Sequence, residues 1–436
     1  MRKSEELPLA SHEDDDERDD NKGYLFISQE STIATMEEPR DTNLVVEPQN
    51  PPPFVLSPVQ MCVKHNVRIA RSDNPQLCYD EEYEVLQLFD TRITLDSWLN
   101  GNNDQNNIVE DDSSDSDIDI DSDSSDDDCR PQGGRIYTAY WIQEHIIDNE
   151  HGHIVNSLWR AIVLNKTAFD SYWVKTDEEV ALKCMSREHI MASRGYIQED
   201  FVKEIAALQH LSSELDLGDY NEGESLHVLT ANTIMVNECN EPSNSFAVIV
   251  MPYCPQDIYE RVVDVKLDTG KGLTETEAKI WFKQMLAGLR TLQRARVCHR
   301  DLSPENFMVL ADTTLVIDFG MCLRIPYRAD GRRQLIQTQS RCGKAPHRAP
   351  EIHNPQPFDG HAVDLWATGT VLLYMLLGTR NRVFEAPQVV VRDLVQYHES
   401  GLLSAVALDL LTKMFQPKPE NRLTLDEIWA HQFLQS

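Results

Sequence analysis

The sequence predicts an α+β domain that follows a disordered acidic arm, and three observations support this prediction. The first 130 residues hold 33 of the 72 acidic side chains but only 10 of the 40 basic ones. After the glycine pair at 133–134 the sequence becomes periodically apolar, so a compact domain is expected to begin near Arg135. Within it, residues 246–251 form an apolar run typical of a buried strand, and residues 201–208 have the apolar spacing of a helix.

The acidity of the arm is concentrated in two blocks. Residues 111–128 comprise ten Asp, six Ser and two Ile, and residues 13–20 form the other block. Like charges at this density repel one another and leave little apolar surface to bury, which predicts disorder over most of residues 1–134. The Pro-rich segment 48–53 and the Asn-rich segment 100–107 are expected to be linkers. Between them, residues 54–98 contain enough Val, Leu, Tyr and Phe for an ordered strand or short helix.

Three interpretations of the Asp/Ser run remain open. It is a solvated linker, a phosphorylation tract or a calcium loop. Alternating Asp117, Asp119 and Asp121 resemble EF-hand ligands, but Ser122 replaces the turn glycine and no glutamate closes the loop. Four serines have an aspartate three residues later and resemble the sites of acidophilic casein-kinase-type enzymes: Ser114, Ser116, Ser124 and Ser125. A regulatory kinase that acts on the arm is therefore a candidate partner.

Charge and composition exclude several classes of function. The formal net charge of −32 argues against binding to nucleic acid or to an anionic membrane. Nine scattered cysteines do not make a disulfide framework. The first residues lack the apolar run of a signal peptide. The longest uncharged apolar stretch, 365–379, has 15 residues, fewer than the roughly 20 of a membrane span. We therefore expect a soluble cytoplasmic or nuclear protein with no nucleic-acid or membrane partner.

The residues best suited to chemistry lie between 297 and 320. Asp301, Asn306 and Asp318 are short oxygen-bearing side chains on loops that flank apolar, strand-like runs. Such ligands suit a hard cation such as Mg²⁺, which usually also holds the phosphates of a substrate. A carboxylate in the same group that is free of metal can accept the proton of a hydroxyl group.

These residues resemble two motifs of the serine/threonine-type eukaryotic protein kinases. The sequence His299-Arg-Asp301 with Asn306 resembles their catalytic loop, and Asp318-Phe-Gly320 resembles their metal-binding loop. Further motifs of that family follow the same order along the chain: Val180-Ala-Leu-Lys183, Glu204, Ala349-Pro-Glu351, Asp364-Leu-Trp-Ala-Thr-Gly369 and Arg422. The resemblance implies a bilobal protein-kinase-like fold, with a small β-rich N-lobe over residues 135–254 and a larger helical C-lobe over residues 255–436.

The resemblance also implies ATP and Mg²⁺ as cofactors and a protein as the substrate. Asp318 and Asn306 are expected to bind Mg²⁺, and Asp301 to orient the substrate hydroxyl and accept its proton. Lys183 is expected to bind the α- and β-phosphates. Glu204 shares the inward face of its predicted helix, so it needs a cationic partner, and Lys183 is the obvious one.

The nucleotide base is expected to bind at the connection between the lobes. The strand predicted at 246–251 leads into Pro252-Tyr-Cys254, which looks like the family's hinge. Adenine would then be bound by the backbone carbonyl of Pro252 and the backbone N–H of Cys254. Ala181, on the same strand face as Lys183, is expected to line the nucleotide site. Asp257 is a candidate for binding the ribose hydroxyls.

The glycine-rich loop of the family is altered in this sequence. Its expected glycines fall at His151, His153 and Asn156. Glycine lets backbone N–H groups approach phosphates closely, so side chains here would weaken ATP binding or give the loop another shape. The two histidines are alternatively metal ligands, although loop histidines without a nearby partner are more often simply polar.

Two further departures form a pair. Ser303 stands where serine/threonine kinases usually carry a lysine, and Lys344 replaces a threonine that contacts both that lysine and the catalytic aspartate. We hypothesise that the positive charge has moved from position 303 to Lys344. The alternative is that Lys344 only faces solvent.

Regulation and the competing function follow from the same resemblance. Arg300 precedes the catalytic aspartate and in many kinases pairs with a phosphate on the activation segment, here residues 318–351. Thr338 and Ser340 are the candidate phosphate acceptors.

The predicted function is an active ATP-dependent serine/threonine protein kinase. The alternative is a pseudokinase or scaffold, which the altered glycine loop favours and the intact core residues disfavour: Lys183, Glu204, Asp301, Asn306 and Asp318.

Overall fold

The computed structural model describes most of the chain from residue 44 onward. The described residues are 44–72, 74, 76–100, 108–109, 135–147, 157–193, 200–217, 227–237, 244–353, 356–379 and 387–435. Several sequence predictions fall outside them: the acidic blocks at 13–20 and 111–128, the four serines Ser114, Ser116, Ser124 and Ser125, and the altered glycine-loop positions His151, His153 and Asn156.

The N-lobe is built on one eight-stranded sheet in the order β2-β8-β9-β7-β6-β5-β3-β4. Strand β2 also pairs with β3, so the first seven strands of this order close on themselves as a barrel. All of these pairings are antiparallel except β2–β8, which is parallel. The strands are β2 (Val59–Val67), β3 (Tyr83–Ile93), β4 (Ile108–Val109), β5 (Ile136–Ile147), β6 (Ser157–Thr167), β7 (Val174–Ser186), β8 (Thr233–Asn237) and β9 (Phe246–Pro252).

The N-terminal boundary expected at Arg135 is wrong, because strands β2 and β3 precede it and complete the sheet. Cys62 of β2 and Leu86 of β3 are fully buried, and they share one apolar cluster with Tyr140, Val180 and Val248 of the later strands. The ordered segment expected at 54–98 therefore packs into the N-lobe. It continues into helix α1 (Leu95–Asn100), where the indole N–H of Trp98 donates a hydrogen bond of 2.9 Å to the backbone oxygen of Asn237.

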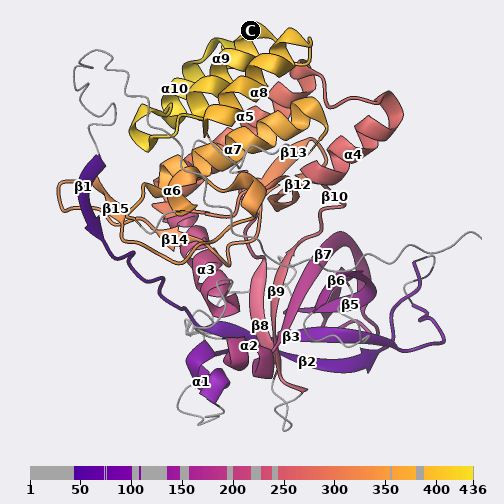
Figure 1. Ribbon diagram of the computed structural model, residues 1–436. Coiled ribbons are helices and arrows are strands. Elements are labelled where there is room, and N and C mark those ends of the chain that lie inside the picture. Colours follow the sequence, from indigo (N-terminus) through magenta and orange to yellow (C-terminus); the bar gives the residue numbers. More distant parts are fainter. Residues whose placement is uncertain are drawn as a thin grey trace, which may run out of the picture. The chain divides into compact units, whose positions relative to one another are not determined.

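The Pro-rich segment 48–53 is docked against the domain, so the prediction of a linker is also wrong. Strand β1 (Leu44–Gln49) pairs in parallel with β15 (Arg333–Ile336), which lies in the activation segment (Figure 1). The backbone oxygen of Pro53 accepts a hydrogen bond of 3.1 Å from Arg324. Proline restricts the backbone to extended conformations and keeps its carbonyl acceptor, which suits a segment that runs along a surface.

The helix predicted at 201–208 is present and longer than expected. Helix α3 (Phe201–Leu217) buries the three apolar residues of the predicted stripe, namely Phe201, Ile205 and Leu208. Asp200 precedes it and accepts a hydrogen bond of 2.9 Å from the backbone N–H of Val202, which satisfies an otherwise unpaired donor of the first turn. Helix α2 (Arg187–Ser193) completes the described helices of the N-lobe.

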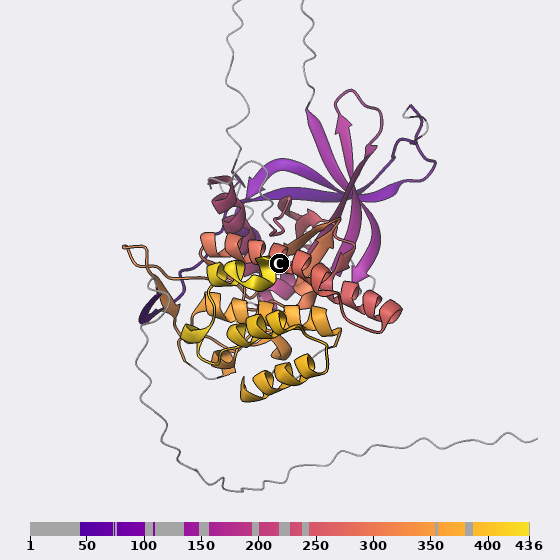
Figure 2. The same cartoon turned by 90° about the horizontal axis from the view of Figure 1, so that it is seen from above.

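The C-lobe is mainly helical, and in Figures 1 and 2 its helices gather on the side away from the large sheet. Short strand pairs, β12 with β13 and β11 with β14, flank the loops that carry the predicted catalytic residues. The helices are α4 (Ile258–Thr269), α5 (Glu275–Arg294), α6 (Pro350–His353), α7 (Gly360–Leu377), α8 (Pro387–Glu399), α9 (Ala405–Met414), α10 (Leu425–Ala430) and α11 (Gln432–Gln435). The short strands are β10 (Gln256–Asp257), β11 (Val297–Cys298), β12 (Phe307–Leu310), β13 (Thr313–Val316) and β14 (Leu323–Arg324).

Helix α7 is the central helix of the C-lobe. The side chain of Asp359 accepts a hydrogen bond from the backbone N–H of His361 at its start, and Gly378 with φ 62° ends it. Helix α7 therefore begins before residue 365 and ends before residue 379, which are the bounds of the apolar stretch in the sequence. Over the described residues, α7 is the one helix long and apolar enough to cross a membrane by length and composition, and the whole of it is buried inside the domain.

The barrel gives a direct test of the added strands. Replacing Leu86 with Ala is expected to lower the free energy of unfolding by about 2–5 kcal/mol, because it removes a fully buried side chain from the barrel interior. Val63→Ala is the matched control, since Val63 lies on the neighbouring strand β2 and is 44% exposed, and it is expected to cost less than about 1 kcal/mol. Denaturant unfolding measures both, and equally small losses would contradict the inclusion of β3 in the core.

Candidate active site

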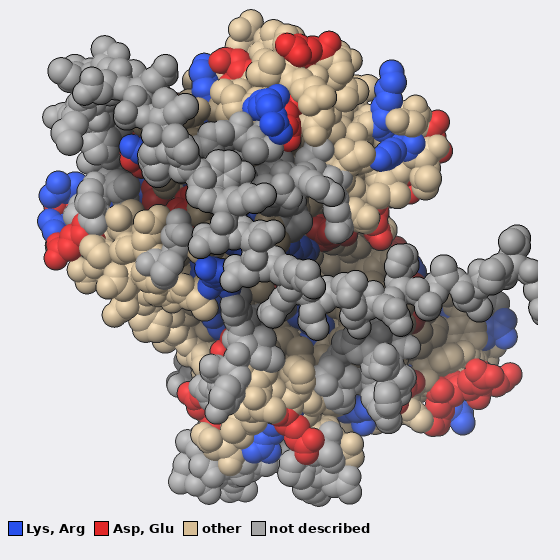
Figure 3. Space-filling view, in the orientation of Figure 1, with Lys and Arg blue, Asp and Glu red and all other residues tan. Residues whose placement is uncertain are grey.

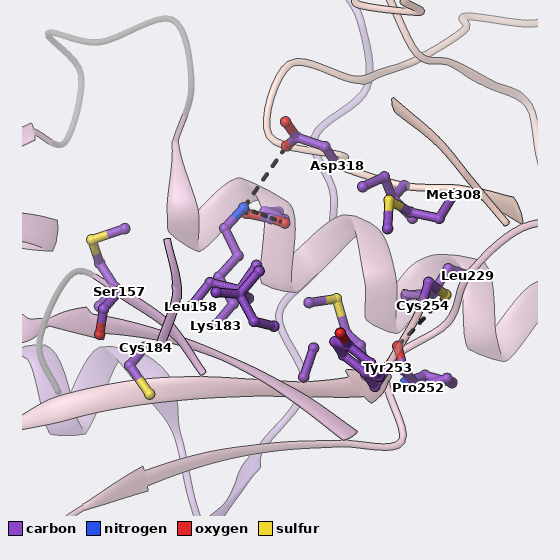
Figure 4. A pocket seen from close by; sticks show the side chains of 16 residues that line it. Ser157, Leu158, Lys183, Cys184, Leu229, Pro252, Tyr253, Cys254, Met308 and Asp318 are labelled. Carbon is purple, nitrogen blue, oxygen red and sulfur yellow. Dashed lines mark hydrogen bonds and ion pairs between the residues drawn. The ribbon is translucent and has the colours of Figure 1, made fainter. Parts of the chain in front are cut away.

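A cavity of about 360 Å³ lies between the N-lobe sheet and the loops of the C-lobe. Its volume falls in the range of small-molecule sites. Ser157, Leu158 and Ala181 line it from strands β6 and β7, and Met308 and Ile317 line it from the C-lobe. Figure 4 shows Pro252, Tyr253 and Cys254 at one end of this cavity and the Lys183 side chain reaching toward Asp318 at the other.

Lys183 connects two acidic side chains at that far end. Its Nζ lies 2.8 Å and 2.6 Å from the two carboxylate oxygens of Glu204, which is 3% exposed. The same ammonium lies 3.8 Å from Oδ1 of Asp318 (Figure 4). The inward glutamate of helix α3 thus has the cationic partner that a buried carboxylate needs. The pair fixes the position of the ammonium inside the cavity.

The predicted hinge residues line the opposite end of the cavity, whereas Asp257 is not among the lining residues. Pro252 and Cys254 lie at the end of β9, where Pro252 pairs with Val180 of β7. Burial raises the pKa of the Cys254 thiol to about 11, so this thiol is a poor nucleophile near neutral pH. Asp257 instead caps helix α4, where its Oδ1 accepts a hydrogen bond of 2.8 Å from the backbone N–H of Glu260.

The catalytic loop is held from below by Asp364 of helix α7. One carboxylate oxygen accepts a hydrogen bond of 2.7 Å from the backbone N–H of His299, and the other accepts one of 2.8 Å from the backbone N–H of Arg300. Burial raises the pKa of Asp364 to about 6, although these two hydrogen bonds favour its ionised form. Arg300 adopts a φ of 71°, a conformation that non-glycine residues rarely hold without such support.

Asp301 and Asn306 lie side by side in this loop. The side-chain amide of Asn306 donates a hydrogen bond of 2.7 Å to the backbone oxygen of Asp301. This bond uses the amide nitrogen and leaves the amide oxygen as the atom that can bind a cation. Burial raises the pKa of Asp301 above its usual value, while the backbone N–H and the ammonium of Lys344 partly oppose that rise.

The residues fit a hard cation. Oδ1 of Asp318 is buried, accepts no hydrogen bond from the described residues, and belongs to a residue with a φ of 67°. Within the described part of the chain, no group of three or more His, Cys, Asp or Glu forms a metal site of its own. Asp318 and the amide oxygen of Asn306 therefore suit a cation that takes its other ligands from water and phosphate, as Mg²⁺ does.

Lys344 lies beside Ser303 and Asp301 of the catalytic loop. Its ammonium is 2.8 Å from Oγ of Ser303 and 3.3 Å from a carboxylate oxygen of Glu305. Its backbone N–H donates a hydrogen bond of 2.9 Å to Oδ1 of Asp301. The preceding Gly343 has a φ of 80°, and a Cβ there would lie 2.6 Å from the backbone oxygen of Arg300, so only glycine allows this close approach.

The end of the activation segment is anchored by a buried ion pair. The guanidinium of Arg422 makes two hydrogen bonds of 2.8 Å to the carboxylate of Glu351, and both side chains are almost fully buried. Arg300 contacts the segment at two places, where it donates hydrogen bonds to the backbone oxygens of Met321 near its start and of Ser340 in its second half. Thr338 and Ser340 are exposed.

Two residues of the site did not come from the sequence analysis as site residues. Asp364 was identified only as part of a helix motif, yet it holds the backbone of the catalytic loop. Glu305 contacts the ammonium of Lys344. A charged residue at the start of an otherwise uncharged apolar helix was the available signal for Asp364, because a buried carboxylate requires hydrogen-bond donors. Glu305 carried no such signal, because a loop glutamate is usually solvated.

Comparison with known proteins identifies relatives of part of the chain. A serine/threonine-protein kinase CHK1 of Mycosarcoma maydis is 35% identical over 175 residues, which cover 38% of this chain and 26% of that protein. A maternal embryonic leucine zipper kinase of Xenopus laevis is 25% identical over 263 residues, covering 59% of this chain and 36% of the relative. A CBL-interacting serine/threonine-protein kinase 26 of Arabidopsis thaliana is 26% identical over 258 residues, which cover 58% of this chain and 52% of that protein.

The matched region thus spans about a quarter to a half of the length of these relatives. A family model described as a protein kinase domain matches residues 167–434. The match begins at the end of β6, after the altered glycine-loop positions, and includes Lys183, Glu204 and the catalytic loop. Because this match covers more than half of the sequence, the chain belongs to the protein kinase domain family.

Proposed function

We propose that this chain is an active serine/threonine protein kinase that transfers the γ-phosphoryl group of ATP to a hydroxyl group of a protein substrate. One observation carries the proposal. Five side chains that phosphoryl transfer requires converge on one cavity and the loop beside it, namely Lys183, Glu204, Asp301, Asn306 and Asp318. Phosphoryl transfer asks for positioning and charge neutralisation more than for covalent chemistry, and this set supplies both.

ATP binds with its adenine at the hinge and its phosphates at Lys183. The backbone carbonyl of Pro252 and the backbone N–H of Cys254 bind the base, and Ala181 lines the base pocket. Lys183 neutralises the α- and β-phosphates while Glu204 holds its ammonium in place. Asp257 contributes through the cap of helix α4, because its carboxylate already accepts the hydrogen bond from Glu260.

Asp318 and Asn306 hold the magnesium of the nucleotide. Magnesium, when bound, neutralises the charge of the terminal phosphates. The buried Oδ1 of Asp318, which accepts no hydrogen bond from the described residues, supports this role. Asn306 is fixed by the hydrogen bond from its amide nitrogen to Asp301, so its oxygen is presented in one orientation.

Asp301 orients the substrate hydroxyl and accepts its proton. The elevated pKa that burial gives this carboxylate makes it a stronger base than an exposed aspartate. Its Oδ1 is held by the backbone N–H of Lys344, so the activation segment and the catalytic loop together set its orientation. The ammonium of Lys344 favours the charged form of this carboxylate and so opposes part of the rise in its pKa.

Lys344 supplies the positive charge that the catalytic loop lacks at Ser303. The contact of 2.8 Å between its ammonium and Ser303 Oγ supports this role, since it brings the charge to the side chain that replaces the usual lysine. Glu305 balances part of this charge while no substrate is bound. When ATP and substrate bind, the ammonium neutralises charge on the transferred phosphoryl group.

Phosphorylation of Thr338 or Ser340 orders the activation segment. Both residues are exposed. The guanidinium of Arg300, whose buried Nε has no hydrogen-bond partner among the described residues, donates a hydrogen bond to the backbone oxygen of Ser340. Burial lowers the pKa of Lys203 on helix α3, and the charge of Arg300 contributes to that shift. A phosphate on either acceptor would give the guanidinium of Arg300 a charged partner, which is the physical basis of the proposed ordering.

Removing the catalytic base tests the enzyme itself. Asp301→Asn is expected to lower phosphate incorporation into a generic protein substrate by about a hundredfold or more, because the amide cannot accept the proton. The assay uses purified protein, Mg²⁺ and labelled ATP, with phosphoamino-acid analysis of the product. Asp268→Asn, an exposed position on helix α4, is the control and should keep wild-type turnover. Equal signals from wild type and Asp301→Asn would favour a pseudokinase or scaffold.

Exchanging positions 303 and 344 tests the relocated charge. Lys344→Thr is expected to lower turnover by about tenfold, since it removes a cation worth roughly 1.4 kcal/mol to the transition state. The double variant Ser303→Lys with Lys344→Thr restores the arrangement of related kinases and is expected to recover most of that loss. Turnover of Lys344→Thr within about twofold of wild type would contradict the proposal.

The same variants have a second readout in their pH dependence. Asp301 must be ionised to act, and its pKa is raised by burial and lowered by the ammonium of Lys344. Removing that ammonium raises the pKa of Asp301 further. The acid limb of the kcat/KM profile should therefore move to higher pH in Lys344→Thr and return in the double variant. An unchanged limb would show that Lys344 does not act on Asp301.

The regulatory proposal is tested on active enzyme. Mass spectrometry is expected to find phosphate on Thr338 or Ser340, and the double variant Thr338→Ala with Ser340→Ala should turn over several-fold more slowly. The reason is that the variant offers no phosphate to which the guanidinium of Arg300 could donate charge-assisted hydrogen bonds. Fully active enzyme with both residues unmodified would contradict the proposal.

A further inference from the structure

An extended segment of the chain, residues 47–57, crosses from the activation segment to helix α3. We call this segment the strap. It is rich in proline, with Pro48, Pro51, Pro52 and Pro53 among its first seven residues. Figure 1 shows β1 running beside β15 and the chain then passing alongside α3 before it enters β2. The strap is therefore the one described segment before β2 that connects these elements.

The first half of the strap binds the activation segment. A carboxylate oxygen of Glu47 lies 2.6 Å from the guanidinium of Arg328. The backbone N–H of Gln337 donates a hydrogen bond of 2.6 Å to the backbone oxygen of Gln49. Figure 3 shows basic and acidic side chains next to one another at the edge of the molecule where Figure 1 draws β1 and β15. Backbone hydrogen bonds and an ion pair together thus hold the first half of the strap against the activation segment.

The second half of the strap binds helix α3. Ser57 and Gln209 make a reciprocal pair, in which the backbone N–H of Ser57 donates to the side-chain oxygen of Gln209 at 2.8 Å and the Gln209 amide donates to the backbone oxygen of Ser57 at 3.0 Å. The ring of Phe54 packs on the ring of His210 with 5.5 Å between centroids. His210 Nε2 in turn lies 3.1 Å from the backbone oxygen of Ala295 in the C-lobe.

Both ends of the strap hold elements that carry groups of the proposed active site. Helix α3 carries Glu204, which fixes Lys183. The activation segment carries Lys344, which contacts Asp301 and Ser303. A movement of about 1 Å in either element would displace these groups, and positioning errors of that size slow catalysis strongly.

The composition of the strap suits this connection. Proline limits the unbound segment to extended conformations close to the bound one, so docking costs less conformational entropy than it would for an ordinary segment. Phe54 and Leu56 are partly buried against the main core, whereas Val55 between them is 74% exposed. Phe54 and Leu56 are therefore the strap side chains that contact the core, and Val55 is not.

We propose that the strap is a positioning element for phosphoryl transfer, which holds the activation segment and helix α3 in register with each other. The proposal rests on the proposed kinase activity. No strap residue lines the nucleotide cavity. Its residues act through Glu204 and Lys344.

The test uses the full chain with three substitutions in the strap, Glu47→Ala, Phe54→Ala and Leu56→Ala. Turnover is expected to fall by about two- to thirtyfold, the range in which residues that couple two sites act. Hydrogen exchange is expected to rise over residues 201–209 and 333–337, and to stay unchanged in helix α7. Val55→Ala is the matched control, because it removes an exposed side chain from the same segment, and it should change neither measurement.

Rescue in trans separates positioning from a general loss of stability. A synthetic peptide of residues 41–58 is expected to restore turnover of the triple variant in a saturable manner, and a peptide with the same three substitutions is expected not to. Wild-type turnover and exchange in the triple variant would overturn the proposal. Exchange that rises throughout the domain without rescue by the peptide would also overturn it. If the wild-type chain transfers no phosphate, the kinase proposal fails, and the exchange measurement still decides whether the strap couples the two elements.

Discussion

The buried carboxylate of Asp364 is the interaction on which the active-site geometry depends. It lies on the buried central helix of the C-lobe and accepts hydrogen bonds from the backbone N–H groups of His299 and Arg300, so this helix directly holds the catalytic loop. Because its two carboxylate oxygens accept hydrogen bonds from two successive backbone N–H groups, Asp364 stabilises the left-handed conformation of Arg300. From this fixed point the loop presents Asp301 and Asn306, and Arg300 reaches the activation segment.

The proposed relocation of charge shows how a motif can change while the electrostatics of a site are conserved. Position 303 and position 344 are 41 residues apart in sequence but in hydrogen-bond contact in space. The ammonium of Lys344 thereby lies beside the side chain that replaces the usual lysine. The constraint that remains is on the backbone, because Gly343 must allow the activation segment to lie against the oxygen of Arg300.

Residue patterns predicted the chemical groups well and the tertiary pairing of the N-terminal region poorly. Lys183, Glu204 and the residues around Asp301 belong to short motifs that are recognisable in the sequence. It was therefore predictable that these residues lie close to one another. The strands 59–67 and 83–93 were not predicted to join the N-lobe, because the pairing of Gln60 with Met235 leaves no local signal. The proline-rich part of the strap, residues 48–53, was mistaken for a linker for a related reason, since proline-rich composition is common to free linkers and to docked extended segments.

The strap contact between Glu47 and Arg328 joins residues 281 positions apart. Non-local contacts of this kind form late, because the loop between them must first be closed. During synthesis the N-terminal strands leave the ribosome long before the activation segment exists, so β1 has no partner until most of the chain has been made. The pairing of β1 with β15 can therefore form only after residues 333–336 have been made, and shorter nascent chains remain without it.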